Sequence, residues 1–186
     1  ALAAPIVLAV CLLYRLLPRR ASLLVFPLAL TLGAATFMRN STYGSVVSIW
    51  SDTVDKYPRN ARAHYNLANA LLSAPAEARD PARAAAEFAA TRELEPGHPT
   101  APSQLGTTLV TLGRYTQAVP PLEAAVQLHG GDVMLRLQLG RALAELGRHQ
   151  AALTQFDEAA RLDPANTTAR TEAARMRELL DRSAAR

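Results

Sequence analysis

The side chains best suited to bind a ligand are carboxamides that recur along the chain. Asn66, Gln104 and Gln138 lie at equivalent points of three similar stretches. Because a carboxamide both donates and accepts hydrogen bonds, a column of them can bind the backbone of an extended peptide without selecting its side chains. Four neighbours are expected on the same surface, namely Tyr65, Asn69, Thr107 and Arg141. These seven residues are the predicted peptide-binding groove, and the alternative is a solvated polar surface that binds nothing.

No other group of residues predicts chemistry. The four histidines are His64, His98, His129 and His149. A metal site needs ligands that converge, whereas these lie far apart and have no cysteine companion, and the single cysteine, Cys11, cannot form an internal disulfide. Gly130-Gly131-Asp132 is interpreted as a turn and not a phosphate loop, because no strand precedes it and no Gly-Lys-Ser/Thr follows. We therefore expect no catalytic residue, no metal and no cofactor in this chain.

The elements that carry the carboxamides follow from a repeated pattern of small and large residues. Leu105-Gly106 returns as Leu139-Gly140, and Gly113 returns at the same distance as Gly147. Within the last stretch the apolar residues are spaced by three or four, as on one face of a helix. This period of about 34 residues and this pattern resemble those of the tetratricopeptide repeat, a helix–turn–helix unit that stacks into a solenoid. The sequence therefore predicts an all-α fold with a concave binding face.

About three repeats fit the chain, with one further helix at each end. The expected bounds are about 61–98, 99–132 and 133–166 for the repeats of the 61–182 solenoid, and 167–182 for a capping helix. Glu172 and Arg175 are among the charged residues expected on the outer face of this capping helix. The first repeat needs a longer turn, because the interval from Ala68 to Gly106 exceeds that from Gly106 to Gly140. A junction helix is expected within 39–60, with Trp50 in the place that Phe88 takes in the first repeat.

The beginning of the chain, 1–38, has the composition of a membrane segment. Residues 21–38 contain no charge, and as a helix they would be roughly 27 Å long, close to the hydrocarbon thickness of a bilayer. Residues 1–17 are interpreted as the end of an earlier membrane helix, so the parent protein is expected to extend upstream. The alternative for 21–38 is a buried helix of a soluble core.

The orientation in the membrane follows from charge. Arg15, Arg19 and Arg20 crowd the short link between the two apolar runs, and the positive-inside rule places that link in the cytoplasm. The repeats are then expected outside the cytoplasm, on the periplasmic side in a bacterium.

From Arg39 onward 17 of the 20 basic residues stand against all 16 acidic ones. Such a near-neutral region lacks the basic stripe of a nucleic-acid binder, and we exclude that class.

The junction between the apolar segment and the repeats resembles one family in particular. Its markers are Arg39-Asn40, Tyr43, Trp50, Asp52, Pro58, Asn60, Arg62-Ala63 and Asn66-Leu67. This junction is similar to that of the transmembrane and tetratricopeptide-repeat proteins related to protein O-mannosyltransferases. The resemblance implies that the chain is the C-terminal part of a larger membrane glycosyltransferase-like protein. It also implies that the catalytic acidic residues lie in early membrane loops, which have no counterpart here.

Two functions are compatible with these observations. The first is a membrane-tethered scaffold that binds a polypeptide on the concave face and serves as the accessory domain of a glycosyltransferase-like parent, whose repeats deliver the acceptor protein. The second is a small membrane-anchored assembly adaptor unrelated to glycosyl transfer. Self-association through the outer repeat face is a third possibility that the sequence does not separate from partner binding. The expected partners are a polypeptide and the lipid bilayer.

Overall fold

The computed structural model describes residue 27, residues 29–36 and residues 44–185. They belong to two compact units, one within residues 1–49 and one that begins at Trp50. The second unit contains the repeats and the predicted groove.

In the first unit, residues 29–36 form a helix with exposed side chains. Half of the predicted membrane helix at 21–38, and all of the earlier one at 1–17, lie outside the described residues. Within the part of the chain that is described, none of the helices combines the length and the apolar character that crossing a bilayer requires.

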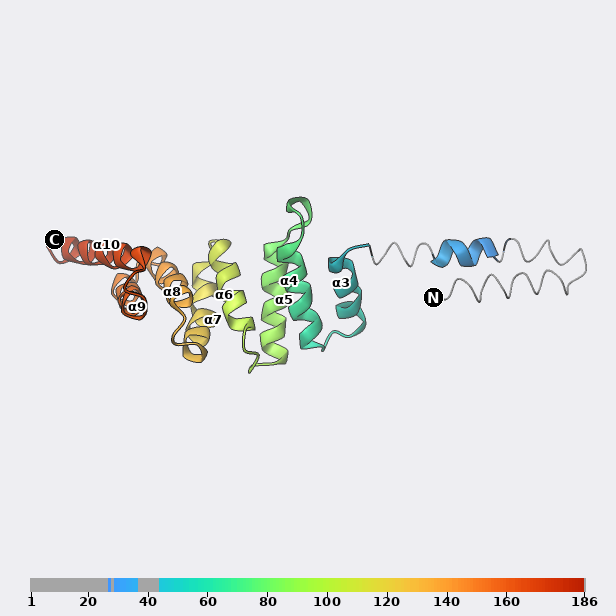
Figure 1. The fold of residues 1–186 in the computed structure, drawn as a ribbon, viewed down its shortest axis with the longest axis horizontal. Coiled ribbons are helices and arrows are strands. Elements are labelled where there is room, and N and C mark those ends of the chain that lie inside the picture. The colour runs from blue at the N-terminus through green and yellow to red at the C-terminus, as the bar shows by residue number, and fades with distance from the viewer. Residues whose placement is uncertain (1–26, 28, 37–43, 186) are drawn as a thin grey trace, which may run out of the picture. The chain divides into compact units, whose positions relative to one another are not determined.

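Eight α-helices follow one another between Val46 and Ala184, and this stretch contains no strand. They are α3 (Val46–Lys56), α4 (Ala61–Ser73), α5 (Pro81–Leu94), α6 (Ala101–Thr111), α7 (Tyr115–Leu128), α8 (Val133–Glu145), α9 (His149–Leu162) and α10 (Thr167–Ala184). A 3₁₀ turn, η1 (Ala76–Ala78), lies in the longer connection between α4 and α5. From α4 to α9 the helices form three hairpins stacked side by side, with α10 after the last (Figure 1). The prediction of an all-α solenoid is confirmed.

Polar residues between the helices fix where the helices begin. The capping residues are Asn60 for α4, Asp80 for α5, Asp132 for α8 and Asn166 for α10. Each side chain accepts a backbone N–H of the first turn, which satisfies a donor that has no partner within the helix. The start of α6 differs, because the Nδ1 atom of His98 accepts from the backbone N–H groups of Thr100 and Ala101.

Glycines allow the two helices of a hairpin to turn and to meet. Gly113 and Gly147 follow α6 and α8 with φ angles of 69° and 73°, a left-handed conformation that residues with a Cβ rarely adopt. Gly140 lies where α8 meets α9, and a Cβ there would come within 2.6 Å of the Cε1 atom of Phe156. The small residue of the repeat pattern is therefore required by the close approach of the two helices.

The core runs along the stack and receives the same residue types from each hairpin. Its members at matching positions of the second helices include Ala84, Phe88, Ala118, Leu122, Ala152 and Phe156. After the last hairpin, α10 buries Ala169, Ala173 and Met176 and packs on α9. Because these three residues are spaced by four and three, α10 turns one apolar face to the stack and covers the end of the core.

Candidate peptide-binding groove

The first helices of the three hairpins hold all the predicted groove residues. They are Tyr65, Asn66 and Asn69 on α4, Gln104 and Thr107 on α6, and Gln138 and Arg141 on α8. Arg141 is exposed, and the other six residues are half-buried. Each of the three column carboxamides directly precedes a buried leucine of its helix, so the column lies beside the core on corresponding faces of α4, α6 and α8.

Tyr65 is the groove residue with the most contacts inside the protein. Its ring meets Phe88 edge-on, with 5.7 Å between centroids, and lies 4.5 Å from the ring of His98. The Oγ1 atom of Thr100 donates to its hydroxyl at 2.9 Å. Tyr65 therefore joins α4 to the start of α6, and its hydroxyl is already engaged, so in this structure it is a packing residue at the edge of the groove.

The carboxamides on α4 and α6 make fewer hydrogen bonds within the protein than they could. The Nδ2 atom of Asn69 donates to the carbonyl oxygen of Tyr65 at 2.9 Å, which holds the side chain along α4 and leaves its Oδ1 atom for another donor. The side chains of Asn66 and Gln104 make no hydrogen bond with any residue that the structure describes. These two carboxamides thus keep their full hydrogen-bonding capacity for a ligand or for water.

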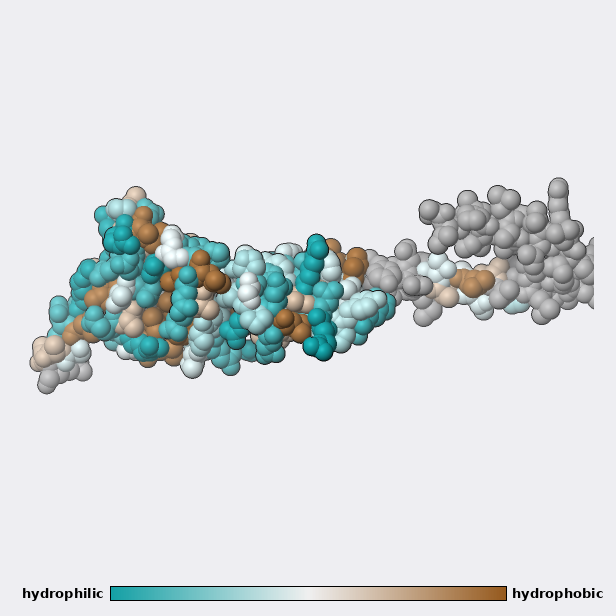
Figure 2. Space-filling model, turned by 90° about the horizontal axis from the view of Figure 1, so that it is seen from below, coloured by the Kyte–Doolittle hydropathy of each residue, from teal (hydrophilic) through white to brown (hydrophobic). Residues whose placement is uncertain are grey.

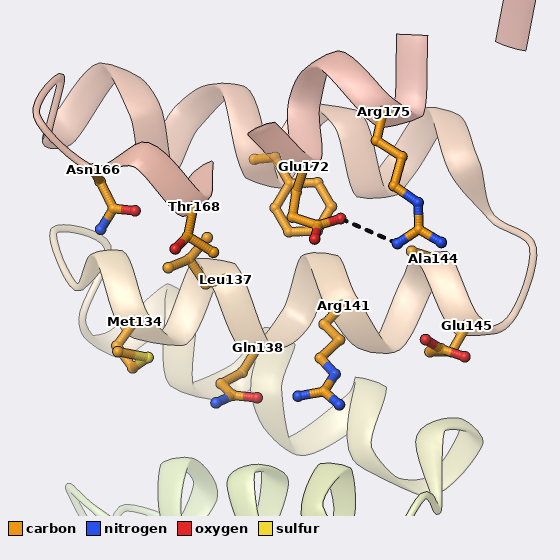
Figure 3. A pocket seen from close by; sticks show the side chains of 11 residues that line it. Met134, Leu137, Gln138, Arg141, Ala144, Glu145, Asn166, Thr168, Glu172 and Arg175 are labelled. Carbon is orange, nitrogen blue, oxygen red and sulfur yellow. Dashed lines mark ion pairs between the residues drawn. The ribbon is translucent and has the colours of Figure 1, made fainter. Parts of the chain in front are cut away.

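A hollow of about 480 Å³ lies between α8 and α10. Its lining comprises Met134, Leu137, Gln138, Arg141, Ala144 and Glu145 of α8, Phe156 of α9, and Asn166, Thr168, Glu172 and Arg175 at the start of and on α10. Figure 3 shows Thr168, Glu172 and Arg175 on one side of α8, and Gln138, Arg141 and Glu145 on the other. The hollow includes two of the seven predicted groove residues and none of those on α4 and α6.

Apolar and polar groups are mixed in this hollow. Leu137, Ala144 and Phe156 supply apolar surface. The Oε1 atom of Gln138 is buried and has no hydrogen-bond partner among the described residues. A buried acceptor without a donor is unfavourable by about 1–3 kcal/mol, so a turn of the Gln138 side chain that offers this oxygen to an N–H donor in the hollow would be favourable.

The sequence interpretation missed the part that α10 plays. It placed Glu172 and Arg175 on the outer face of a capping helix, whereas both side chains line the hollow. The missed signal is the repeat period, because Glu172 lies one period after Gln138, and Arg175 lies one period after Arg141. With respect to the groove, α10 therefore acts as the first helix of a further repeat.

Three of the four histidines, His64, His98 and His129, make hydrogen bonds within the protein. The Nδ1 atom of His64 lies 2.6 Å from a carboxylate oxygen of Glu87, and its Nε2 atom lies 3.0 Å from the carbonyl oxygen of Pro58. The Nε2 atom of His129 lies 2.9 Å from the carbonyl oxygen of Pro99. Among the residues described, no three side chains of the metal-binding types come together.

Comparison with known proteins agrees with this geometry. Residues 103–167 match the family model of the tetratricopeptide repeat, which covers the middle hairpin, the last hairpin and the start of α10. No curated protein sequence matches the chain. Residues 103–167 thus match the tetratricopeptide repeat, and the helices around them continue the same repeat-like, all-helical solenoid. The relation to proteins akin to O-mannosyltransferases stays a prediction from the junction sequence.

Solved structures with low sequence identity share the fold. MamA from Desulfovibrio magneticus RS-1 is 22% identical, with a TM-score of 0.64 over 83% of this chain and 85% of that one. YrrB, described as a TPR protein with an unusual peptide-binding site, is 23% identical, with a TM-score of 0.66 over 82% and 74%. The first TPR domain of Spaghetti (RPAP3), bound to an HSP90 peptide, is 17% identical, with a TM-score of 0.56 over 65% and 93%.

Proposed function

We propose that the repeats bind a polypeptide in extended form along the first helices α4, α6 and α8 and along α10. The observation that carries this proposal is Gln138, which lines a hollow open to solvent and whose buried Oε1 atom has no donor among the described residues. A peptide N–H group would supply the missing donor. Two further carboxamides, Asn66 and Gln104, are unengaged at the equivalent points of the neighbouring hairpins within the described chain, and each can bond a peptide backbone in the same way.

A triple substitution tests this function. We expect Asn66→Ala, Asn69→Ala and Gln104→Ala together to abolish capture of fluorescent peptide pools, since three of the four amides that bond the peptide backbone are removed and Gln138 alone is left. The helical signal in circular dichroism should stay unchanged, because these side chains are outside the core. The matched control replaces three exposed carboxamides of the second helices, Gln117, Gln127 and Gln150, by alanine. Equal capture by both triple variants and the unchanged chain would reject the groove.

For the whole protein we infer a membrane-tethered scaffold, the accessory C-terminal part of a glycosyltransferase-like parent, with the repeats outside the cytoplasm. The support is in the sequence, namely the uncharged stretch at 21–38, the basic link before it and the junction motif. The competing proposal is a small membrane-anchored adaptor unrelated to glycosyl transfer, which has the same tether and the same groove.

One measurement separates these proposals, and a second tests the expected orientation of the repeats. The reading frame upstream of the chain should encode further membrane spans with an acidic pair in the first loop if the parent is a sugar transferase, and an initiator codon directly upstream would favour the adaptor. Protease added to intact spheroplasts of a bacterial host should degrade the repeats if they lie outside the cytoplasm. Protection of the repeats until the cells are lysed would place them inside.

A further inference from the structure

The two ends of the groove differ in charge at one repeat position. This position holds Asn69 on α4, Thr107 on α6, Arg141 on α8 and Arg175 on α10, according to the repeat spacing. The first two side chains are neutral and the last two are cationic. An extended ligand that crosses all four helices therefore meets uncharged groups at one end and two guanidinium groups at the other.

Arg141 is the more available of the two cations. It is exposed and forms no ion pair with any residue in the described part of the chain. The Nη1 atom of Arg175 lies 3.6 Å from the Oε2 atom of Glu172, but the side chain of Arg175 is 66% exposed and that of Glu172 is 34% exposed. An exposed pair of this kind contributes little to stability and is screened by salt. A competing carboxylate can therefore exchange with Glu172 at low energetic cost.

The residues around Arg141 offer a hydrogen-bond acceptor and apolar surface to the parts of a peptide next to its acidic side chain. The buried Oε1 atom of Gln138 lies one helical turn before it, and apolar surface comes from Leu137, Ala144 and Met134, which is 59% exposed. A backbone N–H, an apolar side chain and a carboxylate at successive places on a peptide would match these groups. Glu145, the acid of α8, lines the same hollow and would repel a second acidic side chain beside it.

We propose that the α8–α10 end of the groove selects peptides with an acidic side chain, Asp or Glu, next to an apolar one at the point where the peptide crosses α8. This inference rests on the proposed peptide binding and adds a sequence preference to it. The acid is a side chain within the peptide and not its C-terminal carboxylate, because Arg141 and Arg175 lie on different helices and the peptide continues past Arg141 to reach Arg175.

Blocked nonapeptide pools provide the test. Each pool is acetylated, amidated and labelled, carries Leu-Asp, Leu-Asn or Leu-Lys at its centre, and has equal mixtures of Ala, Ser, Thr and Asn elsewhere. Fluorescence polarisation with the full chain should give a dissociation constant about fivefold lower for Leu-Asp than for Leu-Asn, as expected for one exposed ion pair. The Leu-Lys pool should bind weakest, and raising the salt concentration should reduce all three differences.

Variants assign the preference to the groove. Arg141→Gln should make the Leu-Asp and Leu-Asn pools bind equally. Glu172→Gln should strengthen Leu-Asp binding about twofold or more, since it removes a competing carboxylate from Arg175. Arg148→Gln is the matched control, because Arg148 is exposed in the turn before α9 and does not line the hollow; its preference should equal that of the unchanged chain.

The possible failures are distinguishable. If none of the pools binds, both the proposed function and this preference are wrong. If the Leu-Asp and Leu-Asn pools bind with the same affinity, the groove binds peptides and only the acidic preference is wrong. If Leu-Asn pools with a free C-terminus bind more tightly than the blocked Leu-Asp pool, the groove selects a terminal carboxylate. The proposed recognition of an acidic side chain within the peptide is then wrong.

Discussion

The two ends of the groove are built from the same repeat and yet present different surfaces. At the α4 end Tyr65 covers the space beside Phe88 and is held by Thr100. Leu137 stands at the equivalent position on α8, and there a hollow of about 480 Å³ remains. The repeat pattern thus specifies the buried residues that the hairpins share, whereas single residues outside the pattern decide whether the groove is filled or open.

Figure 2 shows one face of the molecule coloured by hydropathy. Hydrophobic residues appear there in small separate patches among hydrophilic ones, and no broad apolar face is visible in this view of the described residues. A surface of this kind favours recognition by hydrogen bonds and charges, with apolar contacts confined to small hollows.

The largest expected effect is on the core beneath the open end. Phe156→Ala should lower the free energy of unfolding by about 3–5 kcal/mol, because Phe156 is 2% exposed and its removal leaves a cavity between α8 and α9. Phe88→Ala should have a similar effect at the closed end. Urea unfolding followed by circular dichroism measures both changes. A loss below about 1 kcal/mol for either variant would contradict the shared core.

The next effect tests the contact of the two helices of the last hairpin. Gly140→Ala should destabilise the protein by about 1–3 kcal/mol, because the added Cβ would come within 2.6 Å of the rigid ring of Phe156. Gly131→Ala is the control, since a Cβ at Gly131 would meet nothing within 4 Å. The same unfolding experiment should show almost no change for Gly131→Ala, and equal values for the two variants would argue against the close approach.

A third substitution should convert the open end into a closed one. Leu137→Tyr places at α8 the residue type that fills the α4 end, and we expect a loss of peptide affinity of about tenfold with a change in unfolding free energy below about 1 kcal/mol. Polarisation with the Leu-Asp pool and urea unfolding measure the two quantities. Unchanged affinity in a stable variant would mean that the hollow does not take part in binding.

The smallest effect concerns the hydroxyl at the closed end. Tyr65→Phe removes the acceptor for Thr100 and should lower the free energy of unfolding by about 0.5–1 kcal/mol, since Thr100 is exposed and water replaces the bond. Thr100→Val removes the same bond from the other side. In a double-mutant cycle of unfolding free energies the two changes should not add, and full additivity would show that the bond contributes nothing.

The sequence predicted the order of the hairpins because their markers are set by packing between neighbouring helices. Leu139, Gly140 and Phe156 are buried or closely approached for reasons that recur in every repeat. The starts of α4, α5, α8 and α10 could likewise be located from the Asn and Asp residues at the turns. Features that depend on local periodicity and on the spacing of small residues can therefore be predicted from the sequence.

The groove was less accessible because its side chains obey no common packing rule. The sequence did not reveal that Tyr65 is engaged by His98 and Thr100, since these contacts join α4 to the loop before α6, across the whole of α5 in the chain. It also assigned Glu172 and Arg175 to the outside of a cap.

The way in which the helices contact one another has a mechanical consequence. The main contacts from α4 to α10 join each helix to the next in the chain, and α6 also touches α8. Such a stack deforms by small rotations between neighbouring hairpins, and local unfolding begins at its terminal helices. A peptide bound along several hairpins would resist these rotations. Binding of the peptide would therefore appear as an increased stiffness of the repeat region when it is stretched between its ends.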